Sequence, residues 1–210
     1  MSIALIDYGA GNLTSVRKAL QTLGAEVTTP IAPEALAGAT GIVVPGVGHF
    51  GATRALTVEW LPAVRQAVDD GTPMLGICLG MQWLFDGSLE APDVPGLGVV
   101  GGQCTPLDDI GPDGPVKVPH VGWNQLTFPS PSWLLRGVDD GAYVYFTHSY
   151  APPITPACVA VTEHANRFAS VVEQGHIGGV QFHPEKSGQV GLTILGNFLR
   201  RTGAPCSPSA

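Results

Sequence analysis

The chain has 210 residues, of which 10 are lysine or arginine and 17 are aspartate or glutamate, so its formal net charge is −7. This acidic balance, without a basic run, excludes a general nucleic-acid binder, because such proteins neutralise phosphates with clustered lysine and arginine. No apolar stretch reaches the roughly 18 residues that a membrane helix needs, so we expect no membrane partner.

The first half of the chain alternates short apolar runs with segments of helical periodicity. Short apolar runs bounded by turn residues are typical of buried parallel strands, and apolar residues at every third or fourth position indicate helices. The alternation predicts an α/β fold with an open, mostly parallel central sheet and helices on both faces. Strands are expected at 3–6, 26–28, 41–44 and 74–77, and helices at 13–23, 53–69 and 79–85.

The pattern changes after residue 87, where short β-like runs follow one another until a last helix at about 188–201. We expect several of these strands to be antiparallel and to form a smaller antiparallel β section in the second half. One domain is predicted over 1–202, followed by a flexible tail at 203–210. The expected strands lie near 97–104, 115–118, 123–128, 143–148, 157–163, 169–174 and 177–182.

Cys78 lies in the pentapeptide of residues 76–80, which has the form Gly-x-nucleophile-x-Gly between an expected strand and an expected helix. Glycines on either side permit a sharp turn that projects the central side chain outward. The N-terminus of the following helix favours the thiolate form. The sequence therefore favours a nucleophile, and the alternative is a structural cysteine buried between two packing glycines.

His183 and Glu185 are the candidates for the base that a cysteine nucleophile needs and for the group that orients this base. They follow an expected strand, and the proline between them stiffens the link. Considered alone, the pair is best explained as a surface turn, but together with Cys78 it predicts a catalytic triad. His120 and His148 are expected to be hydrogen-bonded structural groups.

Two backbone segments could stabilise the oxyanion that develops in acyl transfer. One is the N–H of Leu79, which directly follows the candidate nucleophile. The other is the loop that ends the neighbouring strand, where Gly46 and Gly48 flank Val47 and allow a peptide to present its N–H inward. An ordinary strand-to-helix turn is the alternative for this loop.

These residues together resemble the class I, triad-type glutamine amidotransferase family, which has a flavodoxin-like fold. Within the family they are most similar to the glutaminase subunits of imidazole glycerol phosphate synthases. The glycine-flanked turn around Cys78 and the His-Pro-Glu sequence are shared across the class. The opening segment, the Gly-Val-Gly loop and the segment around Trp123 are more specific to these glutaminase subunits. It is carried by residues 6–13, 45–48, 76–82, 117–124, 145–150 and 181–187.

The resemblance implies a glutaminase reaction in which Cys78 attacks the carboxamide of glutamine and forms a thioester. His183 gives a proton to the departing ammonia and then activates water, while Glu185 orients His183. The oxyanion is stabilised by Leu79 N–H and by the loop of Gly46, Val47 and Gly48. No metal or organic cofactor is needed. The substrate's amino-acid end is held by Gln82 and by the backbone of His148, Ser149 and Tyr150.

The resemblance also implies a heterodimer with a (β/α)₈-barrel cyclase subunit, which uses the ammonia in histidine biosynthesis, with Trp123 and Lys186 at the interface. Only 13% of the residues are charged, which fits a chain that covers part of its surface with a partner. Without that partner we expect little activity, because one peptide in the loop of residues 46–48 points the wrong way until partner contacts turn it.

The four cysteines are far apart and form no Cys-x-x-Cys pair, which argues against a zinc site and against a disulfide framework. The N-terminus lacks the basic start and the long apolar run of a signal peptide. We therefore expect reduced thiols and a cytoplasmic location.

Three alternatives keep parts of this interpretation. The first is a glutaminase subunit of another synthase, of the anthranilate or aminodeoxychorismate type, which would have the same triad. The second is a stand-alone cysteine hydrolase; such enzymes often have histidine directly after the nucleophile, where this chain has Leu79. The third is a binding subunit without activity, which the complete set of Cys78, His183 and Glu185 disfavours.

Overall fold

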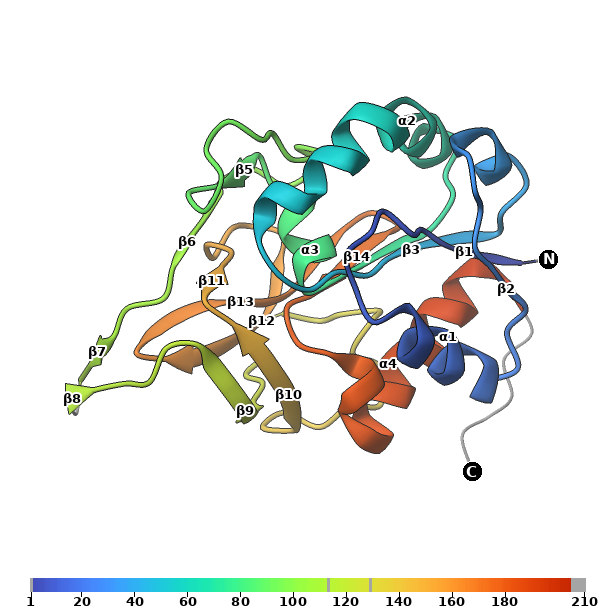
Figure 1. Ribbon diagram of the computed structural model, residues 1–210. Helices are drawn as coiled ribbons and strands as arrows, with labels where there is room; N and C mark the ends of the chain where they lie inside the picture. Colours follow the sequence, from blue (N-terminus) through green and yellow to red (C-terminus); the bar gives the residue numbers. More distant parts are fainter. Residues whose placement is uncertain (1, 113, 129, 205–210) are drawn as a thin grey trace.

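The computed structural model describes residues 2–112, 114–128 and 130–204, and its centre is a seven-stranded sheet (Figure 1). In the order β12-β13-β14-β4-β3-β1-β2, the last five strands run parallel, whereas β12 and β13 are antiparallel to their neighbours. The expected mostly parallel sheet is thus confirmed. Its strands are β1 (Ile3–Leu5), β2 (Val27–Thr28), β3 (Gly41–Val44), β4 (Met74–Ile77), β12 (Cys158–His164), β13 (Asn166–Gln174) and β14 (Ile177–Val180).

Helices cover both faces of the sheet, with α2 above it and α1 and α4 below it in Figure 1. Alternate residues of β1 supply two cores, because successive side chains of a strand point to opposite faces. Ile3 and Leu5 pack with the α1 and α4 side, and Ala4 packs with the α2 side. The helices are α1 (Leu13–Thr22), α2 (Leu61–Asp69), α3 (Leu79–Trp83) and α4 (Gly188–Thr202).

The helix expected at 53–69 runs without interruption over 54–69, where a π section, η3 (Leu56–Trp60), leads directly into α2. A 3₁₀ turn, η2 (Phe50–Thr53), precedes it. Pro62 lies at the start of α2. The expected helix is therefore confirmed over 54–69, and its π section lies where Pro62 supplies no N–H to the helical ladder. A further 3₁₀ turn, η1 (Pro33–Leu36), follows β2.

The second half forms several small antiparallel pairs beside the central sheet, as expected, but β12 and β13 extend the central sheet instead of joining them. The strand expected at 97–104 begins only at Gln103, because the residues before it form turns. The small sheets contain β5 (Gly87–Ser88), β6 (Gln103–Pro106), β7 (Ile110–Gly111), β8 (Gly114–Pro115), β9 (His120–Gln125), β10 (Tyr143–His148) and β11 (Tyr150–Ala151); the turn η4 (Pro184–Lys186) precedes α4.

The end of the chain is partly described. Gly203 caps α4 in the left-handed conformation that glycine adopts readily, and Ala204 is buried against the core. The rest of the expected tail, residues 205–210, lies outside the described residues.

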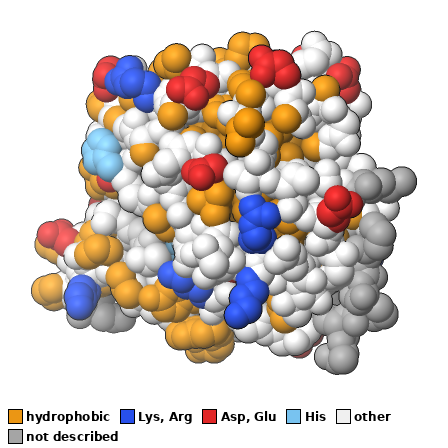
Figure 2. Space-filling view, turned by 45° about the vertical axis from the view of Figure 1, so that its right-hand side comes forward, with side chains coloured by type: hydrophobic (Ala, Val, Ile, Leu, Met, Phe, Trp, Pro, Cys, Tyr) orange, Lys and Arg blue, Asp and Glu red, His pale blue; other side chains and the backbone are white. Residues whose placement is uncertain are grey.

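Within the described ranges no helix combines the length and apolar character needed to cross a membrane. In Figure 2 charged side chains are sparse on the face shown, and apolar side chains gather at its lower edge.

The topology brings three chain segments to one edge of the sheet. β3, β4 and β14 are adjacent and parallel, with Val44 paired to Gly76 and Val180 paired to Ile77. Their carboxyl ends therefore lie side by side, and in open α/β sheets this edge carries the ligand sites. The residues that follow these strands are the expected oxyanion loop, Cys78 and the segment of residues 181–185.

Candidate active site

Cys78 occupies a strained turn between β4 and α3. Its φ of 52° and ψ of −105° are unusual for a residue with a side chain. The flanking glycines are required sterically, since a Cβ on Gly76 would lie 2.6 Å from the carbonyl oxygen of Gly80, and one on Gly80 would collide with the backbone of Val44. The turn aims the thiol toward the Thr147 carbonyl oxygen, 4.0 Å away. This geometry is that of a nucleophile elbow.

His183 and Glu185 lie together behind the cysteine. His183 Nδ1–H donates to Glu185 Oε1 at 2.8 Å, which fixes the imidazole tautomer and leaves Nε2 without a partner among the described residues. Both side chains are almost fully buried. Burial lowers the pKa of His183, but the nearby Cys78 thiolate and the hydrogen-bonded Glu185 carboxylate outweigh it and raise this pKa to about 9. The imidazole therefore stays protonated at neutral pH when the thiolate is present.

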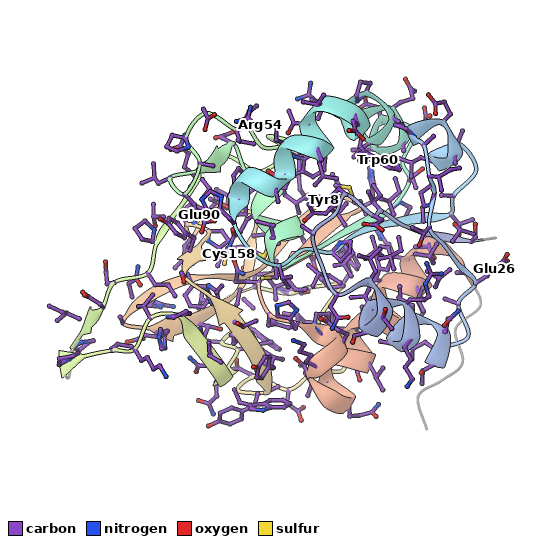
Figure 3. All side chains as sticks on the ribbon, in the orientation of Figure 1. Tyr8, Glu26, Arg54, Trp60, Glu90 and Cys158 are labelled. Atoms are coloured by element: carbon purple, nitrogen blue, oxygen red, sulfur yellow. The ribbon has the colours of Figure 1, made fainter. Side chains whose placement is uncertain are left out.

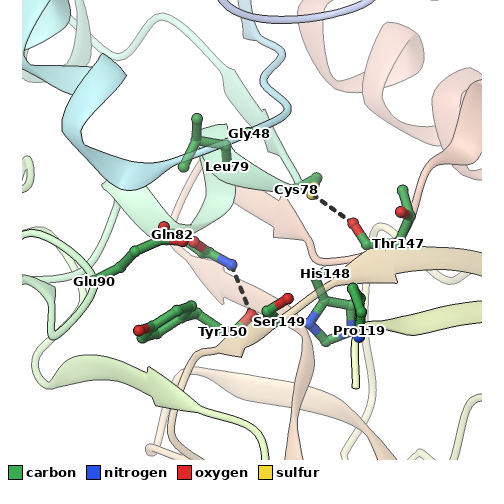
Figure 4. A pocket seen from close by; sticks show the side chains of 10 residues that line it. All are labelled: Gly48, Cys78, Leu79, Gln82, Glu90, Pro119, Thr147, His148, Ser149 and Tyr150. Atoms are coloured by element: carbon green, nitrogen blue, oxygen red, sulfur yellow. Dashed lines mark hydrogen bonds between the residues drawn. The ribbon is translucent and has the colours of Figure 1, made fainter. Parts of the chain in front are cut away.

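A hollow of about 250 Å³ opens in front of Cys78 (Figure 4). It brings together seven of the residues that the sequence indicated. Gly46, Val47, His183 and Glu185 are not among its lining residues, and the side chains of His183 and Glu185 are buried. The volume suits a small polar metabolite. The seven residues are Gly48, Cys78, Leu79, Gln82, His148, Ser149 and Tyr150; Glu90, Pro119 and Thr147 complete the lining.

Gln181 connects the nucleophile to the wall of this pocket, a role that the sequence did not single out. Its amide Nε2 donates to Cys78 Sγ at 3.5 Å, and its Oε1 accepts from Gln82 Nε2 at 3.0 Å. Gln82 Nε2 also donates to the Tyr150 carbonyl at 2.9 Å. The chain of amides holds both glutamines in one orientation and places a donor beside the sulfur. The sequence offered one signal for this role: Gln181 directly follows β14, at the strand end next to Cys78.

Glu90 is the second residue that sequence reasoning missed. It contributes a carboxylate to the pocket (Figures 3 and 4). One oxygen, Oε2, accepts the Phe50 N–H at 2.7 Å, which fixes the side chain at the pocket rim. A carboxylate at this place offers a counter-charge to a cationic group of a bound molecule. Nothing in the local sequence pattern marks it, because Glu90 lies in a turn after the short strand β5, where no periodicity or motif distinguishes it.

The Leu79 N–H, one expected oxyanion donor, is occupied in this structure. It donates to the carbonyl oxygen of Gly46 at 3.3 Å, so a carbonyl stands where an oxyanion needs a donor. Gly46 is held tightly there, since a Cβ on it would lie 2.7 Å from Leu79 Cβ. Gly48 has a φ of 100°, which glycine tolerates. The loop of residues 46–48, hereafter the oxyanion loop, is therefore arranged with its carbonyl toward the site.

The side chain of His148 turns away from the pocket into a buried chain of hydrogen bonds. His148 Nδ1–H donates to the Tyr150 carbonyl at 2.9 Å, so its Nε2 accepts from His120 Nδ1 at 3.1 Å, and His120 Nε2 accepts from Asn124 at 3.2 Å. Burial, together with neighbouring histidines, lowers the pKa of His120 to about 3 and that of His148 to about 4. Both histidines are neutral and hold the pocket backbone in place.

Trp123 and Lys186 lie outside the pocket, on an exposed patch where β9, β10 and η4 meet. The Trp123 ring is 55% exposed and packs edge-on against Tyr145 at 6.1 Å between centroids, and Lys186 Nζ lies 5.6 Å from the centre of the same Tyr145 ring. Tyr145 O accepts the His183 N–H at 2.9 Å. The patch is therefore joined directly to the strand end that carries the histidine.

No group of three or more His, Cys, Asp or Glu side chains in the described ranges could hold a metal ion.

The family model described as glutamine amidotransferase class-I matches residues 4–202. A solved glutamine amidotransferase has a TM-score of 0.74 at 19% identity, covering 97% of this chain and 100% of that chain. PurLQS from Thermotoga maritima gives 0.72 at 17% identity, with coverages of 95% and 97%. The fold is that of the class-I glutamine amidotransferases.

Relatives with higher sequence identity to this chain are subunits of one particular synthase. The imidazole glycerol phosphate synthase subunit HisH of Geobacillus kaustophilus is 48% identical over 94% of this chain and 95% of its own length. The HisH subunit of Thermococcus kodakarensis is 45% identical over 94% of this chain and 99% of its own length. The chain therefore belongs to the class-I glutamine amidotransferase family and, within it, to the HisH subunits.

Proposed function

We propose that this chain hydrolyses glutamine to glutamate and ammonia and delivers the ammonia to the cyclase subunit of imidazole glycerol phosphate synthase. In that subunit the ammonia serves the formation of imidazole glycerol phosphate and aminoimidazole carboxamide ribotide in histidine biosynthesis. The observation that carries the proposal is the elbow cysteine, which has a buried His–Glu pair behind it and a small polar pocket before it. The identity to HisH subunits supports the choice of synthase.

The reaction follows from the positions of three side chains. The Cys78 sulfur attacks the carboxamide carbon of glutamine, and the C–N bond breaks as His183 Nε2 donates its proton to the departing ammonia. The thioester is then attacked by water, which loses its proton to the same nitrogen, and glutamate leaves with the thiol restored. Nε2 is available for both transfers because Glu185 occupies only Nδ1.

The pocket selects glutamine by its two ends. With the carboxamide at Cys78, the α-ammonium group lies toward Glu90, and the backbone of Ser149 and Tyr150, fixed by Gln82 and His148, binds the polar groups between them. A free amino acid is therefore preferred to a glutamine within a peptide, whose α-nitrogen carries no charge.

Replacing Glu90 with glutamine tests this orientation. Glu90→Gln keeps the shape and can still accept the Phe50 N–H, but it removes the counter-charge of the α-ammonium group. We expect KM for glutamine to rise about tenfold, in the range of one charge-assisted hydrogen bond, with kcat little changed. Steady-state kinetics in the presence of the partner measures both. A fall in kcat at unchanged KM would contradict the substrate-binding role.

His183 and Glu185 should differ in the size of their contributions. His183→Ala removes the group that carries the proton and should lower kcat by about 10²-fold, as general acid–base catalysis predicts. Glu185→Gln keeps a hydrogen-bond acceptor for Nδ1 and should lower kcat less than His183→Ala does, since the residue orients the imidazole without carrying the proton. Single-turnover measurements on both variants give the comparison, and equal or reversed losses would refute these roles.

The cyclase partner is proposed to be a (β/α)₈ barrel that binds the patch of Trp123, Tyr145 and Lys186. An exposed tryptophan that packs on a half-buried tyrosine beside a lysine is typical of interface anchors. Recovery of a chorismate-using partner in a pull-down would instead favour the anthranilate or aminodeoxychorismate type.

A glutaminase assay with and without the cyclase tests the whole proposal. Fast turnover that no partner affects would favour a stand-alone hydrolase.

A further inference from the structure

The hydroxyl of Tyr8 is a buried polar group that the proposed reaction has not used. Tyr8 lies in the loop after β1, is 8% exposed and packs in the core on the α2 side of the sheet (Figure 3). Its Oη has no hydrogen-bond partner among the described residues. An unpaired buried hydroxyl destabilises a fold, so the presence of a tyrosine at this position calls for an explanation.

The unpaired hydroxyl lies against the oxyanion loop. A Cβ built on Gly46 would collide with both Tyr8 Oη and Leu79 Cβ, so the hydroxyl and the Leu79 side chain pack together against the same side of Gly46. The neighbouring Gly11 also packs on this residue, since its Cβ would lie 3.4 Å from Gly46 Cα. The loop after β1 thus packs directly against the oxyanion loop at Gly46.

Tyr8 remains a hydrogen-bond donor at this place. Burial, and to a smaller extent the nearby Cys78, raise the pKa of the phenol, so that the hydroxyl keeps its proton. The residue that it touches, Gly46, has a carbonyl acceptor, which now accepts the Leu79 N–H. That bond measures 3.3 Å, which is long for an N–H···O bond and costs little to break.

We infer that the Tyr8 hydroxyl is a positioning residue for the oxyanion loop, and that it becomes the donor to the Gly46 carbonyl when this peptide turns away from Leu79. In the turned arrangement the Leu79 N–H is released for the oxyanion, the Val47 N–H points toward the site, and the hydroxyl gains its missing partner. Tyr8 therefore favours the active loop over the resting one. The inference rests on the proposed glutaminase function.

Tyr8→Phe removes the hydroxyl and leaves the ring in the core. At saturating glutamine and saturating cyclase partner, we expect kcat to fall about fivefold, which corresponds to ~1 kcal/mol, the net contribution of one neutral hydrogen bond. KM for glutamine should stay within twofold, because Tyr8 does not line the pocket. The thermal midpoint of the free variant should equal or exceed that of the parent chain, since an unpaired buried hydroxyl is lost.

Tyr143→Phe is the matched control, because it removes the hydroxyl of a half-exposed tyrosine on β10. Its kcat should equal that of the parent. A Tyr8→Phe complex with kcat within twofold of the parent overturns the inference, as does a loss of kcat accompanied by a lower thermal midpoint, which indicates a merely structural role. Absence of partner-stimulated glutamine hydrolysis in the parent chain would instead refute the proposed function.

Discussion

Cys78→Ser is expected to abolish glutamine hydrolysis, with a loss in kcat of at least about 10⁴-fold. Loss of a covalent nucleophile removes the reaction path, and the remaining groups of such a site provide only background catalysis. A serine hydroxyl is far less acidic than a thiol, and nothing here ionises it to the extent needed. The elbow itself should be unchanged, since its φ of 52° depends on the backbone and on Gly76 and Gly80.

The variant is tested in the complex, by glutamate release and by titration with the cyclase. Partner affinity should be unchanged, because Trp123 and Lys186 lie on the surface patch outside the pocket. Cys158→Ser is the matched control: Cys158 is buried to a similar extent as Cys78, 6% against 5% exposed, but lies on β12. It should keep its turnover. Substantial residual activity in Cys78→Ser would refute the nucleophile assignment.

The central features of the fold and of the candidate triad were predictable because they depend on local patterns. The bounds of β4 coincide with the expected apolar run at 74–77, and the elbow needs glycines that are adjacent in sequence. Cys78 and His183 come together because β4 and β14 pair in parallel, so that residues just after each strand share one edge. A short parallel strand ending in a reactive residue is therefore informative before any coordinates exist.

Features that depend on contacts between distant segments were not predictable. Glu90 reaches the pocket through a hydrogen bond to Phe50, 40 residues away, and no periodicity records such a contact. The unpaired hydroxyl of Tyr8 is visible only once the loop after β1 lies over Gly46. The direction of the Gly46 carbonyl is a property of one peptide, which glycine leaves free to turn, and only the family resemblance led us to expect a wrongly turned peptide in this loop. Such features decide how an already recognisable site is regulated.

We expect the activity to depend on the partner because of that one peptide. The Gly46 carbonyl occupies the Leu79 N–H, so the free chain has a nucleophile and a base but incomplete stabilisation of the oxyanion. Loss of one oxyanion donor lowers kcat by about 10²- to 10³-fold. We therefore expect kcat of the free chain to be lower than that of the cyclase complex by this factor. KM should change less, because most of the pocket lining is already in place.

Steady-state hydrolysis measured across a titration with cyclase, in the presence and absence of the cyclase ligand, provides the test. Trp123→Ala is the control that separates binding from turning of the peptide. It should raise the cyclase concentration needed for half-maximal activity, since the ring is exposed on the proposed contact patch, yet reach the same maximum. A free chain as fast as the complex would contradict the occupied oxyanion site as the resting state. An unchanged half-maximal concentration would remove Trp123 from the interface.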